Sequence, residues 1–479
     1  MTVRKSMPYL EDYADKALKF SLENGCQYCD VRTETTLSNG FLIEDGEIEH
    51  FRSLDEYGMG IRVLTEGAWG FCSISNPLSF EDVKRAVQDV VKSTAHSASR
   101  KKQKVKLADI PTRTFKVNFS VQETPTIDDL INIGFECDKI IRDKKRIIKS
   151  YVTIEYSVFS KFFINSEGTK ISQNFTDVTA DLMATAHESG LTQSVNITEG
   201  GRGGTEMITK KDDVLKSAEF ISQKASELID AKAPHEEKAT VVMNPDFVAL
   251  LSHEILGHPS EADRVIGKEM AWAGGAWWAG RLGEKIGSEN LTVIDDPTIE
   301  GTLGWYKYDD EGVEAAKKTL IEKGVLKSHM QSRETAETFN VRPNSSMRAA
   351  SYKFMPLIRM ACTCIEKGDW DPQEMISEVK NGYLISNMKV PSIDMMRYNW
   401  SISCQFAQKI ENGEPTELLR DVIVMGIAPE FFNSIDACGK DFTVRPITNC
   451  GKGDPMQSMV MGNGGPTIRG VATIKGVQT

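Results

Sequence analysis

The chain has 479 residues, of which 40% are hydrophobic and 26% charged, and its formal net charge is −11. This length is enough for about two to four domains with cores of their own, which excludes small scaffolds that depend on disulfides. The excess of 68 Asp and Glu over 57 Lys and Arg argues against a nucleic-acid-binding surface, because such a surface needs clustered positive charge.

The sequence also indicates the cellular compartment. No window approaches the roughly 18 apolar residues that a membrane-spanning helix needs, and the first residues turn acidic before the apolar core of a signal peptide could form. The nine cysteines are odd in number and scattered, unlike a disulfide framework. We therefore expect a cytoplasmic protein with reduced thiols.

The first half of the chain predicts helices and antiparallel strands. Apolar residues at helical spacing predict four helices, at residues 9–24, 80–93, 127–142 and 212–229. Alternating runs predict a strand meander over 28–75 and hairpin strands over 149–186. The order of helix then meander therefore occurs twice, although the identity between the two stretches is too low to assert a duplication.

Glycine pairs and charge runs predict the connections in this half. Asn39-Gly40, Asp45-Gly46 and Glu66-Gly67 are typical of turns between strands, and the glycine-rich stretch 199–204 predicts another turn. The basic run 100–106 is interpreted as a solvated connector.

A domain boundary is predicted at residues 231–237, where a helix ends and a polar stretch with one proline precedes a new apolar run. After it we expect a buried strand at 239–243, a helix at 245–257, and then short strands with long loops in a barrel-like sheet. The predicted fold class is α+β, with an amino-terminal mixed domain at 1–235 and a β-rich domain at 236–479.

The motif with the clearest chemistry is His253-Glu254-Ile255-Leu256-Gly257-His258, which has the pattern HExxxH. In the better-known HExxH zinc helix, residues i and i+4 lie about 40° apart around the helix and share one face. Residues i and i+5 lie about 140° apart in an ideal helix. Gly257, which permits a widened or left-handed turn, and Pro259, which cannot continue a helix, therefore predict a helix that is distorted or ends at Gly257.

A catalytic zinc ion normally has three protein ligands, and residue types alone leave the third one open. The candidates are Glu261, Asp263, His329 and Cys450. Cys450 is favoured because glycines surround it, and glycine-rich loops can approach a site closely. The competing interpretation makes His253 and His258 a surface and a capping histidine, but three ionisable groups in an otherwise apolar helix seldom lack partners.

These segments resemble the TldD/PmbA family of metallopeptidases, also known as modulators of DNA gyrase, and specifically its TldD-type members. The resemblance covers CDVRTETT, GMGIRVLTEGAWGF, HEILGHPSEADR, YDDEGV, LIEKGVLKSHMQSRETA and CGKGDPMQSMVMGNGGPTIRG. It implies a zinc ion held by His253, His258 and Cys450, with Glu254 as general base. It also implies short or unfolded peptides as substrates in an enclosed chamber, and a homodimer or a heterodimer with a PmbA-like subunit that lacks the metal motif.

Several features beyond the motif are candidates for substrate contact. Asp309 and Asp310 could hold a substrate amino terminus, although a solvated turn is the simpler interpretation. Gly464 and Gly465 belong to a loop that could approach a peptide, whose backbone a β-rich domain can bind by strand addition. Three tryptophans within 270–281 could line a groove or an interface, or pack under a loop: Trp272, Trp277 and Trp278.

Two alternative functions stay open. A dipeptidyl-peptidase family has a HELLGH helix of the same spacing, but it needs a downstream acidic ligand motif of the EExxx(E/D) type, which we do not find after His258. The other alternative is a non-catalytic regulatory or scaffold subunit, which would bind no metal.

Overall fold

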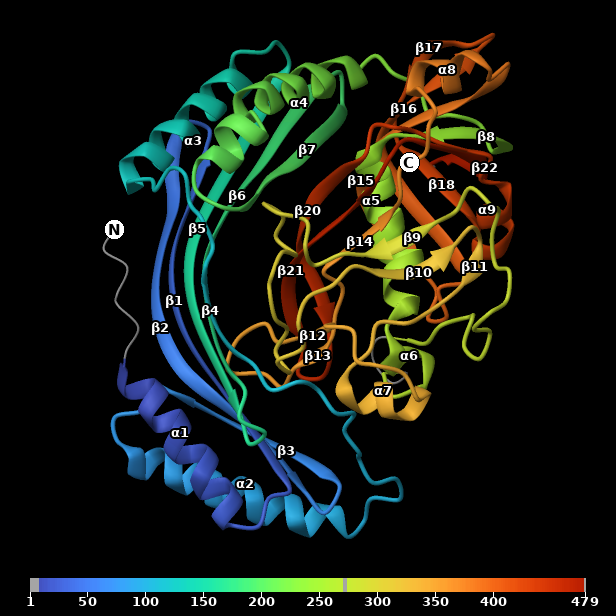
Figure 1. The fold of residues 1–479 in the computed structure, drawn as a ribbon. Coiled ribbons are helices and arrows are strands. Elements are labelled where there is room, and N and C mark those ends of the chain that lie inside the picture. The colour runs from blue at the N-terminus through green and yellow to red at the C-terminus, as the bar shows by residue number, and fades with distance from the viewer. Residues whose placement is uncertain (1–7, 270–273, 478–479) are drawn as a thin grey trace.

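The computed structural model describes residues 8–269 and 274–477, and its amino-terminal part is one long, curved sheet (Figure 1). The strands follow the order β3-β2-β1-β5-β6, and β7 and β4 both pair with β6. Their bounds are β1 (Tyr28–Glu44), β2 (Glu47–Thr65), β3 (Ala68–Ser75), β4 (Thr114–Asn118), β5 (Ile147–Asn165), β6 (Lys170–Glu188) and β7 (Leu191–Arg202).

The two predicted groups of helix and meander are the two halves of this sheet. They join where β1 and β5 pair antiparallel, from Asp30 opposite Asn165 to Glu44 opposite Tyr151. One helix pair packs at each end of the sheet (Figure 1): α1 (Pro8–Glu23) with α2 (Phe80–Ala98), and α3 (Ile127–Arg142) with α4 (Val214–Leu228). Apolar residues on one face of each helix pack on the sheet, so the periodicity located all four helices correctly.

Two turn predictions were wrong. Asn39 and Gly40 lie in the middle of β1, because pairing with β2 on one side and β5 on the other outweighs the local preference for a turn. Glu199 to Arg202 continue β7. There Gly200 has φ +125°, and an added Cβ would lie 2.2 Å from the carbonyl oxygen of Val178, so this glycine serves a close strand contact.

The carboxy-terminal part contains a closed barrel, as predicted. Its strands follow the order β15-β8-β22-β18-β16, and pairing of β15 with β16 closes the ring. They are β8 (Glu237–Met243), β15 (Asn381–Ile393), β16 (Asn399–Glu411), β18 (Val422–Ile427) and β22 (Ile468–Gly476), with β17 (Glu414–Leu419) and β19 (Ala437–Cys438) attached. The division into domains 1–235 and 236–479 stays a prediction.

A second sheet lies beside the barrel, with the order β11-β10-β9-β14-β21-β20. Its strands are β9 (Val293–Asp295), β10 (Lys318–Glu322), β11 (Val325–Leu326), β14 (Cys362–Ile365), β20 (Thr443–Lys452) and β21 (Gln457–Gly465). Helix α5 (Pro245–Leu251) packs against β15 of the barrel and against β20 and β21 of this sheet. The helix that carries the HExxxH motif is therefore held between the barrel and the second sheet.

Short elements complete the chain. They are α6 (Ala262–Val265), α7 (Arg333–Phe339), α8 (Pro372–Ser377), α9 (Ala428–Ser434), the π-helix η1 (Met207–Lys211) and the strand pair β12 (Met347–Arg348) and β13 (Leu357–Ile358). Among the helices that the structure describes, none combines the length and apolar character needed to cross a membrane.

Buried ion pairs join the amino-terminal sheet to the carboxy-terminal part. Arg62 on β2 binds Asp30 on β1 at 2.6 Å and Glu311 of the carboxy-terminal part at 3.0 Å, and all three side chains are at most 1% exposed. Arg333 binds Glu167 at 2.8 Å. Glu167 is 37% exposed, so it is the buried group of Arg62, Asp30 and Glu311 whose charges cannot easily be hydrated if one partner is removed.

Replacement of Arg62 tests this tie. The Arg62→Met variant keeps much of the apolar stem but leaves Asp30 and Glu311 without their cation, so we expect the free energy of unfolding to fall by about 3–5 kcal/mol. The measurement is urea unfolding followed by fluorescence. Arg85→Met, which removes an exposed ion pair with Asp82, is the control and should leave the unfolding midpoint unchanged; an equal effect of both substitutions would contradict the interpretation.

Candidate metal centre

The helix with the HExxxH motif begins as an α-helix and then widens. Asn244 caps its first turn by accepting a hydrogen bond from the backbone N–H of Phe247 at 3.0 Å, and α5 follows. Residues Ser252–Gly257 form a π-helix in which the N–H of His258 bonds the carbonyl of His253. This i→i+5 bond brings the two histidines onto one face, as the predicted distortion requires.

Gly257 is needed for a reason that the sequence did not indicate. Its φ is −72°, which any residue can adopt. A Cβ at this position, however, would lie 2.0 Å from the sulfur of Met360, which is fully buried just before β14. The glycine therefore lets the helix approach the second sheet closely. Pro259 follows in the short 3-10 turn His258–Ser260, where the helix ends.

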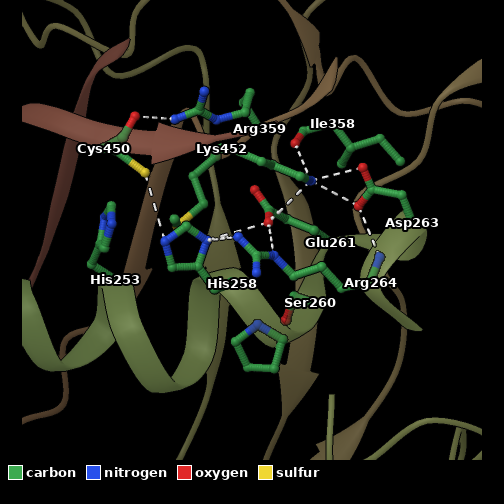
Figure 2. A network of polar contacts seen from close by, with 12 residues as sticks. His253, His258, Ser260, Glu261, Asp263, Arg264, Ile358, Arg359, Cys450 and Lys452 are labelled. Carbon is green, nitrogen blue, oxygen red and sulfur yellow. Dashed lines mark hydrogen bonds and ion pairs between the residues drawn. The ribbon is translucent and has the colours of Figure 1, made fainter. Parts of the chain in front are cut away.

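Two imidazoles and a thiol converge at this widened turn (Figure 2). One ligand atom from each of His253, His258 and Cys450 lies within 4.8 Å of the other two, and the sulfur is 3.6 Å from Nε2 of His258. The three residues are 3–4% exposed. Cys450 lies on strand β20 rather than on the predicted loop, beside a bulge between Ile447 and Cys450, and such bulges can redirect a side chain.

The other nitrogen of each imidazole has a partner that orients the ring. Nδ1 of His253 lies 3.0 Å from Oδ1 of Asn463, whose amide donates to the Thr363 carbonyl at 3.1 Å. Nδ1 of His258 lies 3.2 Å from Glu261. Since Nδ1 is engaged in both rings, Nε2 is left to face the thiol. This arrangement is typical of histidine ligands to metals.

A buried charge network holds Glu261 in place behind His258 (Figure 2). Glu261 binds Arg264 at 2.5 Å and Lys452 at 3.2 Å, and Lys452 also binds Asp263 at 2.7 Å. Burial by itself would raise the pKa of Glu261, but Lys452 and Arg264 hold it well below its ordinary value. Of these two candidates for the third ligand, Glu261 instead orients the His258 ring, and Asp263 binds Lys452.

His329, the remaining candidate, is not part of the cluster. Its ring packs on Phe339 at 5.6 Å, and neither ring nitrogen has a hydrogen-bond partner among the residues that the structure describes. Burial lowers the pKa of His329 to about 4.

The electrostatics of the cluster suit a bound cation. Burial alone would raise the pKa of the Cys450 thiol, but the imidazoles of His253 and His258 hold it well below its ordinary value. Conversely, burial lowers the pKa of His253, but the Cys450 thiolate and Glu254 raise it to about 9. A thiolate with two imidazoles is a donor set that zinc prefers, and three protein ligands are typical of its catalytic sites.

A cavity of about 650 Å³ opens beside the cluster. Its wall includes all three donors and Glu254, whose carboxylate accepts a hydrogen bond from Arg397 at 2.9 Å. Arg397 stands in the tight connection between β15 and β16 with φ +61°, where Asp394 accepts hydrogen bonds from three backbone N–H groups. Nothing in the sequence indicated this arginine, because it is 143 residues from its partner.

The amino-terminal sheet supplies the opposite wall of the cavity, through β6 and β7. Arg445 of β20 bonds Glu199 of β7 at 2.9 Å and Asp246 of α5 at 2.7 Å. The side-chain amide of Gln405 occupies the edge of β7, because it bonds both the N–H and the carbonyl of Asn196. The sequence analysis missed these residues too, since no local pattern marks them.

The residues predicted to bind substrate lie elsewhere. Asp309 accepts backbone hydrogen bonds from Glu311, Val313 and Met347, so it stabilises its own loop. Burial, together with Glu311, raises its pKa to about 8. Asp310 accepts a hydrogen bond from the backbone N–H of Ala349. Both aspartates line a separate cavity of about 160 Å³.

The two predicted glycines support the motif helix from behind. The Gly464 carbonyl accepts a hydrogen bond from Ser252 at 3.1 Å, and a Cβ at Gly465 would lie 2.7 Å from Val248. Neither glycine is part of the cavity wall described above. A direct contact with substrate at Asp309, Asp310, Gly464 or Gly465 therefore gains no support from their positions.

The two described tryptophans of the tryptophan-rich segment, Trp277 and Trp278, pack near the site. Trp278 is fully buried and donates its indole N–H to the Pro259 carbonyl at 2.7 Å, which supports the turn after His258. Trp277 packs edge-on against Tyr398 at 5.9 Å. The packing interpretation is thus confirmed for Trp278, and Trp272 lies outside the described residues.

Comparison with known proteins identifies the class. Family models of the PmbA/TldA metallopeptidases match the chain in three parts: domain 1 at residues 29–94, the central domain at 122–232 and the C-terminal domain at 236–471. The chain belongs to this family, as the resemblance implied.

Individual relatives align with this chain along nearly its whole length. A metalloprotease of Methanocaldococcus jannaschii is 33% identical over 452 residues, which are 93% of this chain and 96% of the relative. A zinc metalloprotease TldD homologue of Saccharolobus solfataricus is 26% identical over 95% and 97% of the two chains. The solved structure of TldE from Thermococcus kodakarensis shares the fold, with a TM-score of 0.75 at 19% identity over 97% of this chain and 100% of that chain.

The role of Gly257 leads to a stability prediction. Gly257→Ala should lower the free energy of unfolding by about 1–3 kcal/mol, because the new methyl group overlaps the sulfur of Met360 and the buried surroundings cannot easily yield. The measurement is urea unfolding. The double variant Gly257→Ala/Met360→Ala should lose less than the sum of the two single variants; strict additivity would show that the two residues do not compete for space.

Proposed function

We propose that this protein is a zinc-dependent peptidase that hydrolyses short or unfolded peptides inside the cavity beside His253. The observation that carries the proposal is the convergence of His253, His258 and Cys450 in the cavity wall that also holds Glu254. The metalloprotease names of relatives that span nearly the whole chain support the same class of reaction.

The donor set is the part of the site that would hold zinc. Nε2 of His253, Nε2 of His258 and the Cys450 sulfur would be the ligands, and Asn463 and Glu261 would keep the rings in place. When bound, zinc polarises a scissile carbonyl and lowers the pKa of water from 15.7 towards about 7, which makes a nucleophile available at neutral pH.

Glu254 would carry the proton. Its carboxylate accepts a proton from the attacking water and passes it to the nitrogen of the leaving amine, so that one group serves in both halves of the reaction. Arg397, at 2.9 Å, fixes the orientation of this carboxylate within the cavity. The side chains of Arg397 and Glu254 are 15% and 14% exposed, so the pair is largely shielded from bulk water.

Strand β20 would bind the peptide backbone. It is the edge of its sheet, and residues 446–451 of this strand line the cavity. The edge of β7 on the opposite wall is already engaged, by Gln405 at Asn196 and by Arg445 at the Thr198 carbonyl. An extended peptide would therefore pair with β20, and such backbone pairing selects weakly among side chains.

The role of Glu254 is tested by its isosteric amide. In Glu254→Gln, the rate of hydrolysis of an unstructured peptide should fall by roughly 10²–10⁴-fold, because the amide cannot accept the proton. The protein should keep its zinc, because Glu254 is not among the proposed ligands. The measurements are product formation by mass spectrometry and zinc by elemental analysis; hydrolysis at the wild-type rate would remove Glu254 from the mechanism.

The metal itself is tested at Cys450. The wild-type protein should contain about one zinc per chain, whereas Cys450→Ser should lose zinc to a chelator that leaves the wild type loaded. Cys404→Ser, which changes a buried thiol of the barrel, is the matched control and should keep the metal. A wild-type protein that is folded and binds no metal would instead favour the regulatory or scaffold alternative.

A further inference from the structure

Three carboxylates line the cavity, and two of them form ion pairs with arginines. Asp246, Glu254 and Asp181 all line it. Asp246 binds Arg445 at 2.7 Å, and Glu254 binds Arg397 at 2.9 Å. Among the residues that the structure describes, Asp181 has no cation within ion-pair distance, and its one hydrogen bond comes from the hydroxyl of Thr198.

The position of Asp181 in the cavity wall makes the lack of a nearby cation unusual. The residue lies on β6, opposite Thr198 of β7, in the wall that faces the motif helix across the cavity. Burial raises the pKa of Asp181, and the hydrogen bond from the Thr198 hydroxyl offsets this rise only in part. Asp181 is only partly exposed, and the charged form of a partly buried carboxylate is stabilised when a cation binds it.

The cations of the cavity wall do not fill this role. Arg397 and Arg445 are held by Glu254 and Asp246, on the other walls. Lys389, the third cation of the wall, is an exposed side chain and forms no ion pair with Asp181 in the structure. The missing positive charge would then come from a molecule that enters the cavity.

We propose that Asp181 is a specificity residue that binds an ammonium group of the peptide substrate, an inference that rests on the proposed peptidase function. The ammonium group belongs either to the amino terminus of the peptide or to a lysine side chain. A peptide paired with β20 lies between that strand and the β6–β7 wall, so its cation meets Asp181 while its backbone stays beside the donor cluster. This assigns to Asp181 the role that the sequence suggested for Asp309 and Asp310.

The experiment compares matched peptides on the zinc-loaded protein. The first pair is an alanine-rich hexapeptide with a free amino terminus and the same peptide acetylated. The second pair is an acetylated hexapeptide with one internal lysine and its norleucine counterpart. For each pair, the ratio of kcat/KM is measured by mass spectrometry in the wild type, in Asp181→Asn and in Asp181→Ser, which keeps a hydroxyl beside Thr198.

In the wild type, the charged member of one pair should be preferred by roughly tenfold, the size expected of a hydrogen bond to a charged group. Both Asp181 variants should bring that ratio close to one. The control Glu188→Gln removes a charge from the far end of β6, where Glu188 pairs with Arg146, and should keep the wild-type ratio. Loss of the preference in the first pair identifies the amino terminus, and loss in the second pair identifies lysine.

Binding separates this inference from the proposed function. Dissociation constants of the same peptides are measured by calorimetry on Glu254→Gln and on Glu254→Gln/Asp181→Asn. If the wild type hydrolyses no peptide but the preference in binding still depends on Asp181, the peptidase proposal fails and the cation site stands. If neither ratio changes when Asp181 is replaced, in hydrolysis or in binding, the inference is overturned.

Discussion

The widening of one helix turn is the constraint on which the rest of the site depends. In an ideal α-helix, His253 and His258 would lie about 140° apart and could not share a ligand. In the π-helix Ser252–Gly257 the turn contains one more residue, so the two side chains lie on the same face of the helix. Asn244 caps the start of α5, and the 3-10 turn that contains Pro259 follows the π-helix, so both ends of the distorted stretch are fixed.

Buried charge then makes the converged side chains rigid. Lys452 follows Cys450 by two residues on β20, and it reaches Glu261 and Asp263 behind His258. The same strand therefore supplies one donor and also anchors the partner of another. Arg359 donates to the Cys450 carbonyl, so the backbone at the cysteine is held as well. Removal of one member of such a network leaves uncompensated charge away from water, which is why these residues act together.

The cavity exists because two separate parts of the fold meet at the motif helix. The motif helix supplies Glu254, the barrel supplies Arg397 and the second sheet supplies Cys450, whereas β6 and β7 of the long sheet supply Asp181 and Thr198. Arg445 spans the junction by binding both Glu199 and Asp246. The proposed proton carrier Glu254 and the proposed cation site at Asp181 thus lie on opposite sides of the cavity, and pockets are common at such junctions.

The sequence by itself determined the local features of this protein. The spacing of apolar residues located the helices, the alternation of residue types indicated the strands, and the unusual interval between two histidines predicted a distorted helix at Gly257. These are effects of neighbouring residues in the chain, and a local pattern records them. Asn39-Gly40 shows the limit of such patterns, because pairing on both sides of β1 overrode the turn that the two residues favour.

Only the tertiary structure decided which distant residues complete the site. Cys450 could be ranked above Glu261, Asp263 and His329 from its glycine neighbours, but the convergence itself depends on the pairing of β20 with β21. Arg397 meets Glu254 across 143 residues, and Asp181 enters the cavity through the position of β6. Such contacts depend on the packing of whole sheets and on burial. The residues that neighbour each contact in the chain indicate neither.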